Sequence, residues 1–202
     1  TLPDQFAATI ELMQLGVPVI YQGTLEHQVG ATKFNGRPDF LVRADYSVSF
    51  SGQALVVEQS GQGQANHYFV LDAKLAANPK PENLLQVGLY IDALIEIGFN
   101  HPGKHGLLMG DRSLALFDQI DLLPATREAR MKIQQAAERL ANSQDHSWLQ
   151  WENLEKFCPT AALCKKCDYE QLCVEQRHAV DHLQLVANIR KDQISKLNQV
   201  DR

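Results

Sequence analysis

The sequence predicts a mixed α/β (α+β) fold in which a helix, three strands, a second helix and a further strand follow one another. Apolar residues recur at helical spacing in residues 4–15 and 81–98, and short alternating or apolar runs typical of strands lie between and after them. Of the 202 residues, 45% are hydrophobic and 21% are charged, which suits one well-packed globular domain with a small appendage.

The first half of the chain predicts a helix and a hairpin. An apolar stripe in residues 4–15 ends at a glycine, which predicts a helix that stops there. Residues 17–27 and 39–50 are predicted as two strands of a hairpin, with residues 30–38 as the turn region between them. Residues 51–66 are rich in Gly, Gln and Ser, so we predict a loop there.

The second half continues with a strand over residues 67–74, HYFVLDAK. A proline-rich break then starts a long helix over residues 81–98. Short strands are predicted over residues 105–109 and 114–117, followed by a helix over residues 124–142. The stripe expected to bury one side of the long helix consists of Leu85, Leu89, Ala93 and Ile97.

Two carboxylates and a lysine stand at predicted strand ends. Asp72 and Lys74 are two residues apart on an extended chain, which places both side chains on the same face of the sheet. Asp39 opens an apolar run after a turn signal, so it also lies at a strand end. The two ends can meet around one Mg²⁺ or Mn²⁺, with the Ala73 carbonyl as a third oxygen ligand and Lys74 placed to position water or stabilise negative charge.

Gln86 and Tyr90 complete the candidate site. They are an i, i+4 pair on the long helix, so an amide and a phenol share one face and can hold a phosphate or brace Lys74. Each of these features also has a plain alternative. A lone Asp-x-Lys flanks many edge strands, and Gln86 and Tyr90 taken singly suit positions at the border of a core.

These residues resemble a known family when they are taken together. Gly36-x-x-Asp39, Asp72-x-Lys74 and Gln86-x-x-x-Tyr90, in this order, are similar to the PD-(D/E)xK phosphodiesterase superfamily and to its RecB-like nuclease branch. The bacterial group that the chain most resembles is often joined to a superfamily 1 helicase. The segments that carry the resemblance are residues 19–22, 36–43, 70–76, 80–90 and 181–197.

The resemblance implies a restriction-endonuclease-like αβββαβ core and a Mg²⁺- or Mn²⁺-dependent, exonuclease-like DNA nuclease in repair, recombination or defence. Asp39, Asp72, Lys74, Gln86 and Tyr90 would be its catalytic residues. Single-stranded DNA or duplex ends would be the substrate, with a superfamily 1 helicase domain or protein as a possible partner. The net charge of −5 counts against a broad basic nucleic-acid surface, so strong unaided DNA binding is not expected.

The chain departs from the family pattern at both ends. In that group a helix before the first strand carries an acidic or histidine metal ligand and, earlier, a first cysteine, whereas this chain begins at Thr1, after both. Glu11 is the nearest acid on the remaining helix, and we interpret it as a solvated residue. Residues 191–202 resemble the start of a helix-hairpin-helix. We therefore expect a fragment, or a protein that needs a partner segment.

Four cysteines crowd the C-terminal part of the chain: Cys158, Cys164, Cys167 and Cys173. The last three match the spacing of iron–sulfur nucleases in the resembling superfamily, which implies a [4Fe–4S] cluster with Cys158 as the fourth ligand or as a bystander. Structural Zn²⁺ is the alternative, since four sulfurs suit a tetrahedral site and His178 and His182 follow nearby; free buried thiols are a third. We interpret both histidines as helix-surface residues.

The predicted organisation is a nuclease core over residues 1–145, a cysteine segment over 146–180 and a helical tail over 181–202. No apolar run approaches the roughly 20 residues that span a bilayer, and no signal peptide is recognised, so the sequence predicts a cytoplasmic protein without a membrane partner. Two other classes remain open. One is a catalytically incompetent nuclease-like module that binds DNA or a helicase, and the other is a structural adaptor built around zinc or a cluster.

Overall fold

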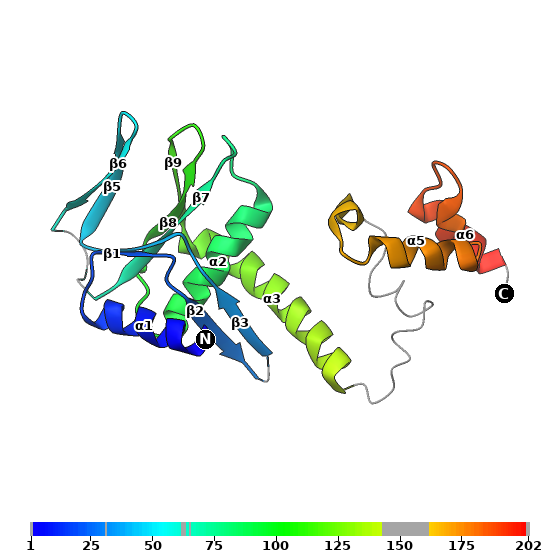
Figure 1. Cartoon of the computed structure of the whole chain (residues 1–202), viewed down its shortest axis with the longest axis horizontal. Helices are drawn as coiled ribbons and strands as arrows, with labels where there is room; N and C mark the ends of the chain where they lie inside the picture. Colours follow the sequence, from blue (N-terminus) through cyan, green and yellow to red (C-terminus); the bar gives the residue numbers. More distant parts are fainter. Residues whose placement is uncertain (1, 31, 62–63, 65, 143–161, 201–202) are drawn as a thin grey trace. The chain divides into compact units, whose positions relative to one another are not determined.

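The structure, a computed structural model, describes residues 2–30, 32–61, 64, 66–142 and 162–200. The chain divides into two compact units, Thr1–Asn142 and Ser143–Arg202. Every strand found in the described residues belongs to the first unit (Figure 1). No helix in the described part of the chain is long and apolar enough to cross a membrane.

A five-stranded mixed sheet forms the centre of the first unit (Figure 1). The strands lie in the order β1, β4, β7, β8, β9, and only β7 and β8 are parallel. Helix α2 forms the crossover between these two, because parallel strands cannot be joined by a tight turn. The strands are β1 (Val19–Tyr21), β4 (Phe40–Arg43), β7 (Tyr68–Lys74), β8 (Lys104–Met109) and β9 (Leu114–Asp118).

Strand β7 connects the two hydrophobic cores of this unit. Tyr68 and Val70 belong to the larger cluster, which also contains residues of α2, while Leu71 belongs to a smaller cluster on the opposite face. Side chains alternate along a strand, so Asp72 and Lys74 share the face of Tyr68 and Val70. The sheet therefore presents both residues on the side that α2 covers.

Two hairpins lie outside the central sheet, and both correct the sequence-based expectations. The predicted hairpin of residues 17–27 and 39–50 is only partly correct. The end of its first strand belongs to β2 (Leu25–Val29), which pairs with β3 (Thr32–Gly36) in the predicted turn region. Gly30 has a φ of 58° at this turn, a value that glycine adopts without strain. Of the segments predicted to pair, only β1 and β4 do so.

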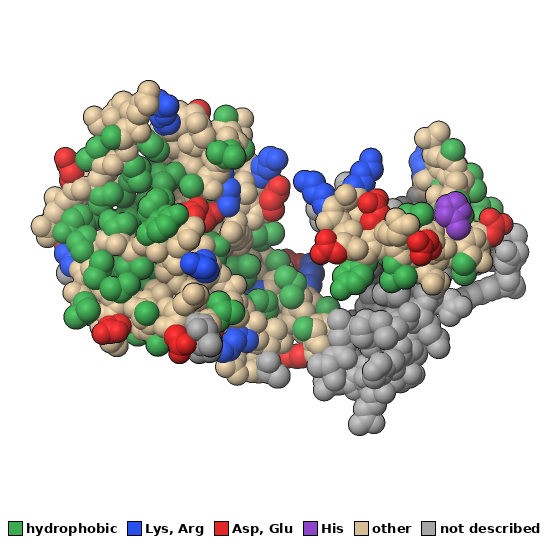
Figure 2. All heavy atoms as spheres, viewed as in Figure 1, with side chains coloured by type: hydrophobic (Ala, Val, Ile, Leu, Met, Phe, Trp, Pro, Cys, Tyr) green, Lys and Arg blue, Asp and Glu red, His purple; other side chains and the backbone are tan. Residues whose placement is uncertain are grey.

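The second hairpin joins β5 (Tyr46–Ser51), in the second predicted strand, to β6 (Ala54–Gln59), which lies where the sequence predicted a loop. Its two-residue turn begins at Gly52, whose φ is 59°. Half-buried apolar side chains of this hairpin pack against the smaller core cluster. Figure 2 shows hydrophobic side chains gathered on this part of the first unit, where a hairpin rather than a helix covers the sheet.

Helices cover the other face of the sheet. Helix α1 (Leu2–Gln14) and helix α2 (Pro81–Glu96) agree with the predicted segments, but α3 (Gln119–Asn142) begins five residues before the predicted start at Pro124. Proline is common in the first turn of a helix, which suggested the later start.

The predicted apolar stripe of α2 is only partly correct, since Ala93 is buried but its three partners are half-buried. The fully buried apolar residues are Val87, Ile91 and Leu94.

The described part of the second unit is helical. It consists of the 3₁₀ segments η2 (Ala162–Lys166) and η3 (Leu183–Leu185) and the helices α5 (Glu170–Ala179) and α6 (Lys191–Val200). Helix α5 contains no buried residue. The mixed α/β class predicted from the sequence is confirmed by the sheet and helices of the first unit.

Candidate active site

The two predicted carboxylates meet at the ends of neighbouring strands. Strands β4 and β7 are antiparallel, with Phe40 opposite Leu71, so Asp39 lies beside Asp72 at the end of this pair. The backbone N–H of Asp39 is 3.4 Å from Asp72 Oδ1, and the backbone N–H of Ala73 donates to Asp39 Oδ2 at 2.8 Å. Each carboxylate is therefore held by a backbone N–H group of the other strand.

Lys74 joins the carboxylate pair to helix α2. Its ammonium forms an ion pair with Asp72 Oδ2 and donates a hydrogen bond to Gln86 Oε1 at 2.9 Å. The Asp72 side chain is only 3% exposed, whereas that of Lys74 is 21% exposed. Asp72 Oδ2 has no well-directed hydrogen bond from the described residues, so its contact with Lys74 is an ion pair without hydrogen-bond geometry.

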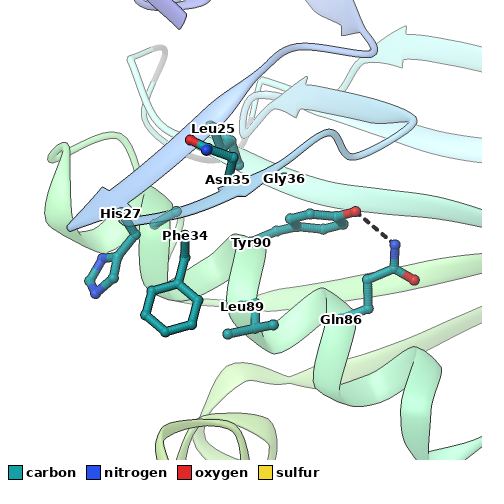
Figure 3. A pocket seen from close by; sticks show the side chains of 9 residues that line it. Leu25, His27, Phe34, Asn35, Gly36, Gln86, Leu89 and Tyr90 are labelled. Atoms are coloured by element: carbon teal, nitrogen blue, oxygen red, sulfur yellow. Dashed lines mark hydrogen bonds between the residues drawn. The ribbon is translucent and has the colours of Figure 1, made fainter. Parts of the chain in front are cut away.

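Gln86 and Tyr90 extend the same network along α2. Gln86 Nε2 donates to the Tyr90 hydroxyl at 2.7 Å (Figure 3). This hydroxyl is 3.4 Å from the Arg37 carbonyl. Lysine has only donors, so the amide oxygen of Gln86 faces Lys74 and the amide nitrogen faces Tyr90. Burial raises the pKa of the Tyr90 phenol, and the protonated hydroxyl points its donor toward the Arg37 carbonyl.

Gly36 sets the position of the Tyr90 ring. A Cβ atom placed on Gly36 would lie 2.4 Å from Cε1 of Tyr90, closer than any real contact of this kind. The Gly-x-x-Asp segment therefore contributes more than a carboxylate, since its glycine allows the ring to pack against β3 and its Arg37 carbonyl receives the phenol. The sequence pointed to Gly36 and Tyr90 separately, but their contact joins residues far apart in the chain.

The residues present fit a hard divalent cation. Asp39 and Asp72 supply carboxylate oxygens, and each carboxylate has about four acceptor sites, so their backbone hydrogen bonds leave room for a cation. Mg²⁺ is commonly held by one or two carboxylates together with water and substrate phosphate. Among the described residues no group of three or more His, Cys, Asp or Glu side chains is arranged to hold a metal ion, so the carboxylate pair would rely on such outside ligands.

Among the described residues, no hydrogen bond or ion pair found joins Glu11 to this network. It is an exposed residue of α1, which agrees with its interpretation as a solvated helix residue. Ala73 is likewise exposed, at the end of β7. Its N–H holds Asp39, while the role expected of its carbonyl as a metal ligand remains a prediction.

The cysteine segment is only partly described. Cys158 lies outside the described residues, Cys164 is in η2, Cys167 follows it, and Cys173 is in α5. Cys167 is exposed, and its N–H donates to the Cys164 carbonyl at 3.0 Å. The described cysteines do not by themselves form a metal-binding group.

The two histidines of this segment have different surroundings. His178 is an exposed residue of α5. His182 lies beyond the end of α5, where its Nδ1 accepts a hydrogen bond from the Gln184 N–H at 3.1 Å and caps η3. The interpretation of His182 as a helix-surface residue is therefore wrong in its detail, since the residue caps a 3₁₀ segment.

The five residues predicted as catalytic thus lie in one connected site. Asp39 contacts Asp72, Asp72 contacts Lys74, Lys74 contacts Gln86, and Gln86 contacts Tyr90.

Comparison of the chain with models of protein families gives no match, and comparison with curated proteins gives none either.

Proposed function

We propose that this chain contains a metal-dependent DNA nuclease domain of the RecB-like group in the PD-(D/E)xK superfamily. The observation that carries the proposal is the network from Asp39 through Asp72, Lys74 and Gln86 to Tyr90. Isolated acidic or basic residues at strand ends are common, but this network joins two carboxylates, one ammonium, an amide and a phenol from three elements. Such a set suits the binding and hydrolysis of a phosphodiester.

The order of the elements supports the same proposal. With the two hairpins set aside, α1, β1, β4, β7, α2 and β8 follow one another in the chain, and the four strands are neighbours in this order in the sheet. This is the αβββαβ order expected for a restriction-endonuclease-like core. The hairpins β2–β3 and β5–β6 would then be insertions into that core.

The proposed chemistry assigns a separate task to each group. Asp39 and Asp72 would hold Mg²⁺ or Mn²⁺, with the Ala73 carbonyl as a further ligand. When bound, such an ion lowers the pKa of its water and neutralises phosphate charge. Lys74 would offer its ammonium to the negative charge that develops on the phosphate oxygens, while Gln86 keeps that ammonium in place. Gln86 and Tyr90 would orient the phosphate.

The proposed partners follow from this chemistry and from the resemblance. The substrate would be single-stranded DNA or duplex ends, delivered by a superfamily 1 helicase domain or protein, because a chain with a net charge of −5 is poorly suited to capture DNA alone. The cysteine segment would carry a [4Fe–4S] cluster, with Zn²⁺ as the alternative occupant.

A binding-only module is the second candidate, and one observation favours it. The Lys74 ammonium already pairs with Asp72 Oδ2, and no third acidic, histidine or cysteine ligand joins the carboxylate pair among the described residues. In that case the site would recognise the DNA backbone without cleaving it. The two candidates differ in whether DNA is hydrolysed.

The test is cleavage of labelled single-stranded and duplex DNA in Mn²⁺ by the full chain, purified without oxygen. Asp72→Asn keeps the shape of the side chain but removes its charge, and Asp121→Asn, on the exposed surface of α3, is the matched control. The proposal expects cleavage by the wild type and the control but not by Asp72→Asn. DNA binding without cleavage by any of the three proteins would favour the binding-only module.

A further inference from the structure

A pocket of about 220 Å³ lies between the β2–β3 hairpin and α2 (Figure 3). Gln86 and Tyr90 line it, and the same two side chains carry the hydrogen bonds that lead to Lys74. A group bound in this pocket would therefore lie next to the position proposed for the phosphate. Gln86 and Tyr90 thus connect the pocket to the carboxylate pair through Lys74.

The pocket suits an uncharged planar ring. Phe34, Leu89 and the Tyr90 ring border it, and Figure 3 shows Phe34 from β3 near Leu89 from α2. None of its described lining residues is Lys, Arg, Asp or Glu, so the pocket does not suit a phosphate. Aromatic side chains in such walls bind nucleobases by stacking, with little dependence on sequence.

His27 lines the pocket and carries a donor that has no partner among the described residues. The residue is 8% exposed, and its Nε2 lies 2.6 Å from a guanidinium nitrogen of Arg130. Arginine can only donate, so Nε2 must accept and the imidazole proton sits on Nδ1. Burial, followed by the charge of Arg130, lowers the pKa of His27, which agrees with this neutral form. Nδ1 has no hydrogen-bond partner among the described residues.

A buried N–H without an acceptor is costly, and a bound ligand that supplies an acceptor removes this cost. Nucleobases carry carbonyl oxygens and ring nitrogens at their edges that can accept such a hydrogen bond. The pocket thus combines aromatic walls suited to the face of a base with a lining residue, His27, that has a donor suited to its edge.

We propose that this pocket binds one unpaired nucleobase of the DNA strand, next to the phosphate held at Lys74 and Gln86. The inference rests on the proposed nuclease function and adds a base-binding subsite to it. A base inside the pocket cannot remain paired or stacked in a duplex, so the site selects single-stranded DNA or frayed ends. Phe34 would contact the face of the base, and His27 would donate to its edge.

Two probes with the same phosphate separate base binding from phosphate binding. Thymidine 5′-monophosphate carries a base, and 2-deoxyribose 5-phosphate does not. Each is titrated in Mg²⁺ into the ¹⁵N-labelled full chain, and binding is followed by amide chemical shifts. We expect thymidine 5′-monophosphate to bind about tenfold more tightly, in line with the energy of one base stacked on an aromatic ring, and to shift the amides of Phe34, Asn35 and Leu89.

The variants test whether Phe34 makes the difference. Phe34→Leu keeps an apolar side chain but loses the ring, so the affinities of the two probes should converge. Phe50→Leu, the same change in a half-buried residue of β5, is the matched control and should keep the wild-type difference. Thermal unfolding checks that both variants fold, and the comparison of the probes on wild-type protein stands without them.

The results distinguish this inference from the nuclease proposal. Equal affinity of the two probes for the wild type, or base-dependent shifts confined to residues outside the pocket, would overturn the nucleobase site even if DNA is cleaved. Base-dependent shifts at the pocket would support it, and would do so even if the cleavage assay finds no hydrolysis. In that last case the nuclease proposal alone would fail.

Discussion

The Asp39 and Asp72 side chains are held by two hydrogen bonds that run in opposite directions between neighbouring strand ends. The N–H of Asp39 lies 3.4 Å from Asp72 Oδ1, and the N–H of Ala73, next to Asp72, donates to Asp39 Oδ2 at 2.8 Å. Two carboxylates at neighbouring strand ends repel each other when both are charged, and only Lys74 pairs with Asp72 in the ion pairs found among the described residues. A divalent cation would relieve this repulsion, so the arrangement leads to a prediction about stability.

Mn²⁺ should stabilise the wild-type protein, and Asp39→Asn should lose most of this effect. Asparagine can still accept the hydrogen bond from Ala73, but it removes one negative charge from the cation site. At 100 times the dissociation constant, bound metal contributes about 2.7 kcal/mol, which raises the Tm of a domain of this size by roughly 5–10 °C. Thermal unfolding with and without Mn²⁺ measures the increase in Tm, with Asp121→Asn as the control. An equal Tm increase in all three proteins would contradict a cation at Asp39.

Lys74→Gln should separate metal binding from catalysis. The ammonium competes with a cation for Asp72 Oδ2, so its removal should leave the Mn²⁺-dependent increase in Tm equal or larger. Cleavage should fall by about 10²–10³-fold, the usual effect of losing one group that stabilises developing negative charge. The measurements are the cleavage rate and the Tm, and Lys132→Gln, an exposed lysine of α3, is the control. A variant that cleaves at the wild-type rate would remove Lys74 from the mechanism.

Gly36→Ala should destabilise the protein through Tyr90. The new methyl group would lie 2.4 Å from Cε1 of that ring, so ring or hairpin must move, at a cost of about 1–3 kcal/mol. In a Tyr90→Leu background the same change should cost less, because the ring is gone. A double-mutant cycle by urea unfolding measures this coupling. If Gly36→Ala costs the same in both backgrounds, the ring contact does not explain the glycine.

Cys167→Ser should remove the cofactor proposed for the C-terminal unit. The thiol is exposed in the described structure, so a bound cluster or zinc ion would protect it from alkylation. We expect the oxygen-free wild-type protein to contain iron and inorganic sulfide, and Cys167→Ser to contain neither. Zinc in place of iron would select the alternative occupant. If the Cys167 thiol of the wild-type protein is alkylated rapidly and the protein contains neither iron nor zinc, both the cluster and the zinc site are excluded.

The residues of the candidate site were predictable because they follow local rules. Alternation along β7 places Asp72 and Lys74 on one face, and helical spacing places Gln86 and Tyr90 together on α2. These rules hold before any tertiary contact forms. Their meeting at Asp39 is a long-range relationship, which the sequence indicated through strand ends and through the family resemblance.

The hairpins and the buried face of α2 were harder to predict for physical reasons. The apolar run of β6 is flanked by Gly, Gln and Ser, so composition indicated a loop although Phe50 packs opposite Leu55. Helix α2 contacts both the sheet and α3, with Gly88 against Thr126, so it is buried on more than one side. A helix of this kind has no single apolar stripe, and the packing partner rather than the sequence selects Val87 and Ile91 as fully buried residues.

His105 should make the stability of the first unit depend on pH. It is fully buried in β8, where Nδ1 accepts from the Val70 N–H at 3.1 Å and Nε2 lies 3.0 Å from the His101 carbonyl. Burial lowers the pKa of His105 from 6.5 to about 4, so the unfolded chain binds a proton over this interval while the folded chain does not. Its contribution is therefore present in full above pH 6.5 and is lost as the pH falls toward 4.

The expected loss is about 3 kcal/mol in the free energy of unfolding. His105→Asn keeps an acceptor for the Val70 N–H but cannot titrate, so its stability should vary less with pH across this interval, whatever its absolute value. Urea unfolding at a series of pH values measures the slope, and His178→Asn, an exposed histidine of α5, should keep the wild-type slope. Carboxylates that titrate in the same range contribute equally to all three proteins. Identical slopes for wild type and His105→Asn would show that the buried imidazole does not control this dependence.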